Sequence, residues 1–123
     1  MKTAWFGGLI GVLLLAGQAF GATYYVDASN VSGIEDGTEV SPFSSIRTAL
    51  IGAHYQGDTI LVAPGIYYGG GLKINNGVRL LSTDGPEVTI IDGMDGGTLL
   101  TGPVASGAWP DAASAVEGFT LRN

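Results

Sequence analysis

The fold is decided by residues 57–68, which read Gly57-Asp58-Thr59-Ile60-Leu61-Val62-Ala63-Pro64-Gly65-Ile66-Tyr67-Tyr68. Two short runs within it, 59–62 and 65–68, are rich in the β-branched, aliphatic and aromatic residues that favour strands. The Pro-Gly pair between them is a turn signal, because proline cannot donate a ladder hydrogen bond. The segment therefore predicts two short strands in close succession.

Similar runs recur along the rest of the chain. Four of them begin at Thr59, Val78, Thr98 and Gly118, at intervals of 19, 20 and 20 residues. Further short runs lie between these four, at 65–68, 72–74 and 88–91. A fixed period with more than one strand in each repeat is typical of a coiled solenoid. A β-sandwich, whose turns also recur at short intervals, remains the alternative.

Alternation within two of the runs predicts which side chains face inward. Val78 and Leu80 are expected inside and Arg79 outside. In the last run, the inward positions are Phe119 and Leu121, and the outward positions are Thr120 and Arg122.

One helix is predicted upstream, from Phe43 to His54. Apolar residues there follow one another at spacings of 3, 4 and 3, which is the period of an amphipathic helix; they are Phe43, Ile46, Leu50 and Ala53. Such a helix needs an apolar surface to cover.

The amino terminus predicts a secretory signal peptide at residues 1–21. Lys2 is the only charge before Asp27, and the 13 residues from Ala4 to Ala16 are apolar or small. Ala19 and Gly21 are the small residues at positions −3 and −1 of a cleavage point after Gly21. Cleavage after Ala22 is the alternative. The apolar run is too short for a membrane-spanning helix, which needs about 20 residues. We therefore expect residues 22–123 to be secreted, extracellular or cell-surface, without a membrane anchor.

Charge and cysteine content narrow the function classes. The chain has 5 basic and 11 acidic residues, so removal of Lys2 leaves a net charge of −7. This charge argues against nucleic acid and against anionic membrane surfaces as partners. The chain has no cysteine, which excludes a disulfide scaffold and a thiolate metal site.

Several segments together resemble the opening of exported right-handed parallel β-helix repeat proteins of the pectin-lyase-like superfamily. The segments that carry the resemblance are 24–30, 36–37, 41–49, 57–68, 85–93 and 116–123. The resemblance implies an all-β fold, a right-handed parallel β-helix (solenoid) of three sheets with an N-terminal amphipathic capping helix. The cap residues are then Phe43, Ile46 and Leu50, and residues 22–123 form the cap and the first three to four rungs.

The resemblance also raises an expectation about the other end of the solenoid. No closing helix or charged segment follows Leu121 in the sequence. We therefore expect either further rungs, in a longer protein truncated here, or an end-to-end partner on the last rung.

No specific catalytic set is found in the sequence. His54 is the only histidine, and no phosphate-binding or nucleophile motif is present. A run of β-branched and aromatic residues at 23–26 also predicts a short strand, and a polar loop follows it from Asp27 to Ser41. Acidic and amide side chains crowd this loop, and Asp27, Asn30 and Asp36 are candidate Ca²⁺ ligands. Their alternative role is turn formation. Apart from this possible Ca²⁺, we expect no cofactor.

Two functions remain open at this point. The first is an exported β-helix module that binds or presents, with polysaccharide as the expected partner and no active site in this chain. The second is the capping part of a polysaccharide lyase or glycoside hydrolase of pectin-like substrates, with its catalytic rungs downstream. Tyr67 and Tyr68 are candidates for stacking on sugar rings, and alternation requires one of the two to point outward.

Overall fold

The structure is a computed structural model that describes residues 21–102 and 114–123. The predicted signal peptide lies outside these residues except for Gly21. One helix, α1 (Ile46–Gly52), accompanies nine strands in the described part of the chain. The strands are β1 (Thr23–Val26), β2 (Thr59–Val62), β3 (Gly65–Tyr68), β4 (Leu72–Lys73), β5 (Arg79–Ser82), β6 (Thr89–Asp92), β7 (Leu100–Thr101), β8 (Ala115–Glu117) and β9 (Thr120–Arg122).

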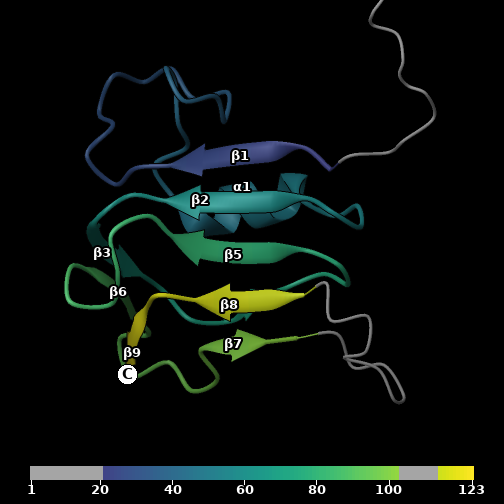
Figure 1. Cartoon of the computed structure of the whole chain (residues 1–123). Helices are drawn as coiled ribbons and strands as arrows, with labels where there is room; N and C mark the ends of the chain where they lie inside the picture. Colours follow the sequence, from purple (N-terminus) through teal and green to yellow (C-terminus); the bar gives the residue numbers. More distant parts are fainter. Residues whose placement is uncertain (1–20, 103–113) are drawn as a thin grey trace, which may run out of the picture.

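The strands form three sheets, and every pairing is parallel (Figure 1). The first sheet has the order β1-β2-β5-β8, the second β3-β6-β9 and the third β4-β7. From β2 onward the chain visits the three sheets in the same order each time. The all-β class is confirmed, and the two strands predicted within residues 57–68 are β2 and β3.

The fixed period of about 20 residues is wrong beyond its first step. Thr59 pairs with Arg79, which is 20 residues later, but Arg79 pairs with Ala115, which is 36 residues later. The run at 98–101 contributes β7, which pairs with β4 in another sheet. Strand-like runs resemble one another in composition whichever sheet they enter, so their spacing in sequence did not identify partners. β8 had not been predicted.

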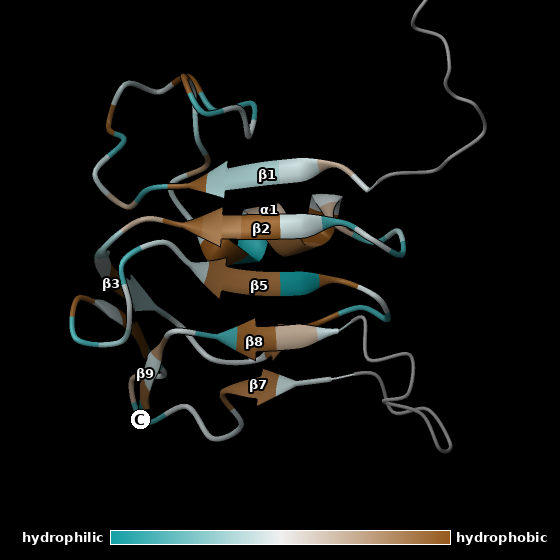
Figure 2. Ribbon diagram, in the orientation of Figure 1, coloured by the Kyte–Doolittle hydropathy of each residue, from teal (hydrophilic) through white to brown (hydrophobic). Residues whose placement is uncertain are grey.

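The core consists of inward side chains that stack from strand to strand. Ile60 lies in register with Leu80, and Tyr67 with Ile91, and all four are buried. Figure 2 shows the hydrophobic residues of β2 and β5 side by side. The inward placement of Val78 and Leu80 and the outward placement of Arg79 are confirmed.

Leu121 in β9, which was predicted to face inward, is more exposed than that prediction implies. Leu121 is in register with the buried Ile91, yet it is 48 % exposed. No further strand pairs with β9 in the described residues, so the outer side of this position lacks a neighbour.

The helix is shorter than predicted, and Phe43 lies outside it. The N-cap is Ser45, whose side chain accepts a hydrogen bond from the Arg47 amide at 3.1 Å. The Phe43 amide donates to the Tyr25 carbonyl, and the Phe43 carbonyl accepts from the Asp27 amide. Phe43 therefore forms a parallel bridge with Val26 and cannot join the helix. His54 lies beyond the other end of the helix.

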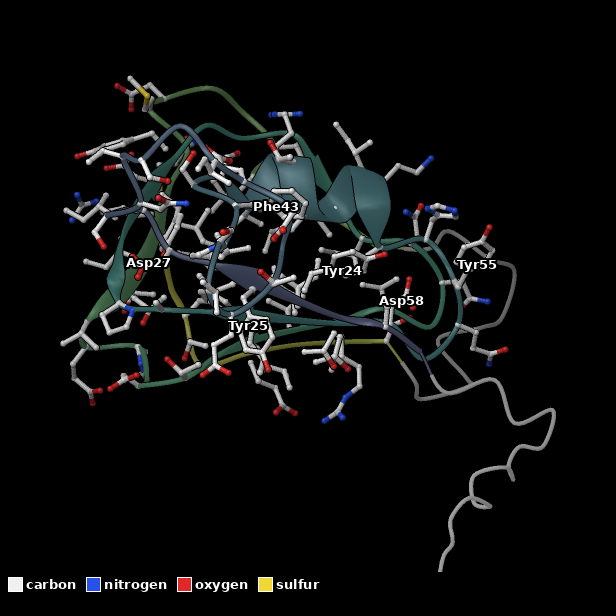
Figure 3. The ribbon with its side chains drawn as sticks, turned by 90° about the horizontal axis from the view of Figure 1, so that it is seen from above. Tyr24, Tyr25, Asp27, Phe43, Tyr55 and Asp58 are labelled. Atoms are coloured by element: carbon white, nitrogen blue, oxygen red, sulfur yellow. The ribbon has the colours of Figure 1, made fainter. Side chains whose placement is uncertain are left out.

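All three predicted cap residues contact the core. Ile46 and Leu50 are buried, and Phe43 is partly buried against the same cluster. The rings of Phe43 and Tyr24 stack at 6.3 Å between β1 and the helix (Figure 3). α1 contacts β1, β2 and β4.

Replacing Ile46 by Asp should lower the free energy of unfolding by more than about 3 kcal/mol, because it removes a buried side chain and introduces a charge. The matched control is Ile51→Asp on the same helix: Ile46 is 2 % exposed and Ile51 is 73 % exposed. Urea unfolding of both variants measures the difference. Equal midpoints would show that the buried face of α1 does not support the fold.

One ion pair joins neighbouring strands of the second sheet. Asp92 and Arg122 are register partners on β6 and β9, and Arg122 Nε lies 2.7 Å from Asp92 Oδ2. The Arg122 guanidinium and the amide of Met94 both donate to this carboxylate and hold the pKa of Asp92 below its ordinary value. The stabilisation is therefore present above the unfolded pKa of about 3.9 and is lost as the pH falls through the lowered folded value.

Lowering the pH from 6 to 2 should destabilise the wild type more than it destabilises Asp92→Asn or Arg122→Gln. Unfolding midpoints at both pH values measure this loss in the wild type, the single variants and the double variant. The two substitutions should be non-additive, because each removes the same pair. Additive effects would mean that the two charges do not interact.

Candidate functional site

A hollow of about 410 Å³ lies beside β3. One wall is the loop that follows β1, and the other is the segment that leads into α1. The residues that line it are Ala28, Asn30, Val31, Ser44, Ser45, Ile46, Arg47, Ile66, Tyr67, Tyr68, Gly69 and Leu72. Both apolar and hydrogen-bonding groups therefore face the same space, which is the usual composition of a ligand site.

Alternation along β3 decides which side chains face this hollow from outside the core. Ile66 and Tyr68 point outward, and Tyr67 between them is buried. Tyr68 is 64 % exposed. The predicted outward tyrosine is thus Tyr68.

Tyr67 holds the wall of the hollow in place. Its hydroxyl donates to the Ala63 carbonyl at 2.7 Å and accepts from the Ala28 amide at 3.1 Å. Burial raises the pKa of Tyr67, so the hydroxyl stays protonated and able to donate. Tyr67 therefore ties the loop after β1 to the corner between β2 and β3.

Tyr67→Phe should destabilise the protein by about 1–3 kcal/mol, because it leaves the Ala28 amide and the Ala63 carbonyl without their partner. Tyr68→Phe, one residue further along the same strand, should have no measurable effect, since no hydrogen bond to the Tyr68 hydroxyl exists in the described structure. Thermal unfolding of the two variants makes the comparison. A larger loss in Tyr68→Phe would contradict the assignment.

Hydrogen bonds hold two polar residues of the opposite wall, Ser44 and Arg47, in place. Glu35 accepts from the amide and hydroxyl of Ser44 at 2.9 and 2.8 Å. These hydrogen bonds lower the pKa of Glu35 and keep it charged. The Arg47 guanidinium donates to the Gly70 carbonyl, which fixes a cation at the rim of the hollow. No pattern in the sequence singles out Arg47, because its place depends on the pairing of distant segments.

The three predicted Ca²⁺ ligands each close a turn of their own. Asp27 accepts from the amide and hydroxyl of Ser29, Asn30 from those of Ser32, and Asp36 from those of Thr38. Thr38 also lowers the pKa of Asp36. Within residues 21–102 and 114–123, no three His, Cys, Asp or Glu side chains gather into a group that could hold a metal ion.

The turn-forming alternative thus has direct hydrogen-bond support at all three residues. The side-chain amide of Asn30 also donates to the Ile34 and Pro42 carbonyls, at 3.0 and 2.6 Å. These hydrogen bonds connect the two ends of the long loop. Ca²⁺ binding at Asp27, Asn30 and Asp36 stays a prediction.

The outer face of the second sheet continues away from the hollow. Tyr68, Asp92 and Arg122 are aligned in one row across β3, β6 and β9. A second row consists of Ile66, Ile90 and Thr120. An extended ligand seated in the hollow would therefore meet both polar and apolar side chains along this face.

No helix in the described parts of the chain has the length and apolarity that a membrane crossing requires. Comparisons of the chain with protein-family models, with curated proteins and with solved structures find no match.

Proposed function

We propose that this chain is an exported, noncatalytic module that binds polysaccharide on the outer face of a right-handed parallel β-helix capped by α1. Three observations support the fold part of the proposal: the described strands pair in parallel, from β2 onward the chain visits the three sheets in a constant order, and α1 contacts strands β1, β2 and β4. The predicted signal peptide supports export.

The hollow beside β3 is the observation that carries the binding function. Sugar rings present apolar faces edged with hydroxyl groups, so a site for them needs a flat apolar side chain beside hydrogen-bonding groups. The exposed ring of Tyr68 supplies the first, and tyrosine combines an apolar ring with a polar end. Asn30, Ser44 and Arg47 line the same hollow.

Net charge selects the class of polysaccharide. Residues 22–123 contain 4 basic and 11 acidic residues, which gives a net charge of −7. A chain this acidic repels polyanions over distances of several ångströms. We therefore expect a neutral polysaccharide to bind better than polygalacturonate.

Affinity electrophoresis in gels that contain a neutral β-glucan should retard the protein more than gels that contain polygalacturonate. Tyr68→Ala should weaken the retardation by about 2- to 12-fold, the range that aromatic contacts provide. Tyr55→Ala is the matched control, since Tyr55 is 67 % exposed and lies outside the hollow.

Equal losses in the two tyrosine variants would remove the hollow as the binding site, and no retardation on any polysaccharide would overturn the proposed function. Incubation with polygalacturonate, with and without Ca²⁺, covers the enzymatic alternative. The appearance of unsaturated products would make the protein a lyase.

A further inference from the structure

Asp58 is a buried carboxylate in the turn between α1 and β2. It is 1 % exposed, and backbone amides donate to both of its oxygens. The Ala22 amide donates to Oδ1 at 2.8 Å, and the Tyr55 amide donates to Oδ2 at 3.1 Å. Within the described residues the ion pair between Asp92 and Arg122 is the only one, so Asp58 has no cationic side chain as a partner. Buried carboxylates normally have one.

The residue that reaches Asp58 is the first residue of the predicted mature chain. Ala22 directly precedes β1, and its carbonyl accepts from the Thr59 amide at 2.9 Å. Both backbone groups of Ala22 are therefore fixed against the start of β2. Figure 3 shows Asp58 beside the beginning of β1.

We propose that hydrolysis of the Gly21–Ala22 peptide bond creates an α-ammonium group at Ala22 that forms a buried ion pair with Asp58. This inference rests on the proposed export, which brings the chain to a signal peptidase. Water supplies the oxygen that makes Gly21 a carboxylate. The Ala22 nitrogen keeps its electron pair and takes up protons, so a neutral amide becomes a cation at the same place.

Gly21, the residue before the proposed cut, packs against the backbone of residues 57–58. A Cβ at this position would lie 1.9 Å from the carbonyl carbon and oxygen of Gly57 and 2.3 Å from the Asp58 amide nitrogen. These neighbours are backbone atoms and cannot move aside easily. Only glycine therefore fits at position 21 in this arrangement. Processing at this position would charge the nitrogen that already contacts Asp58.

Mass spectrometry of the exported protein tests the position of the cut. The full chain is produced in a bacterium that secretes it, and we expect a mature protein that begins at Ala22. A mature protein that begins at Thr23 lacks the nitrogen that contacts Asp58 and would overturn this inference alone. A chain that stays uncleaved inside the cell would instead overturn the proposed export.

Acetylation of the mature amino terminus tests the ion pair. Lys73→Arg removes the only other amine of residues 22–123, so that acetylation then modifies Ala22 alone. Acetylation should raise the unfolding equilibrium constant at least about tenfold, because it leaves Asp58 without its cation. In the Lys73→Arg protein that also carries Asp58→Asn, acetylation should change the unfolding equilibrium constant little. In the one that carries Asp36→Asn, the matched control on an exposed loop, acetylation should have its full effect. An equal effect in all three proteins would refute the pair.

A measurement on the unsubstituted carboxylate covers the case in which Asp58→Asn does not fold. The rate at which Ala22 is acetylated is compared between the native protein and the same protein unfolded in urea. An amine engaged by Asp58 should react several-fold more slowly in the native state. Equal rates in the two states would overturn the inference.

Discussion

Parallel, in-register stacking of strands is the constraint on which the rest of the structure depends. In a parallel ladder each residue lies beside its partner on the same face, so an apolar column continues only if each strand provides an inward apolar side chain. The column through Ile60 and Leu80 meets this condition with complete burial. Tyr24 is the first residue of this column, and its ring stacks on the ring of Phe43 in the segment before α1. The segment that leads into the helix is therefore tied to this column.

The same constraint orders the outer surface. Residues between the inward positions must point outward, and register places them in rows across the sheet. The row of Tyr68, Asp92 and Arg122 is created in this way by three segments distant in sequence. Its members need no common motif, because the ladder aligns them. A surface of this kind suits a long, repetitive ligand better than a small compact one.

Much of the fold could be predicted from local composition. The β2 and β3 segments were identified by β-branched and aromatic runs beside a proline, and the burial of Leu80 by simple alternation. Pairing partners could not be predicted from spacing, because the segments between paired strands differ in length. The start of the helix was misplaced for a related reason. The spacing of Phe43 from Ile46 fits a helix, but the backbone of Phe43 is committed to hydrogen bonds with β1 and the loop that follows it. The site was only partly predictable: alternation required one of Tyr67 and Tyr68 to point outward without deciding which, and Arg47 required the folded arrangement.

The unequal distances between paired strands also bear on how such a chain can change over evolutionary time. Partners in the first sheet are 36, 20 and 36 residues apart, although their hydrogen-bonded contacts are alike. Loop closure entropy grows only with the logarithm of loop length, so lengthening a corner costs little. Insertions and deletions at the corners therefore leave the stacked columns intact. New surface can be acquired there without redesign of the interior, and a corner that grows beside β3 would reshape the hollow first.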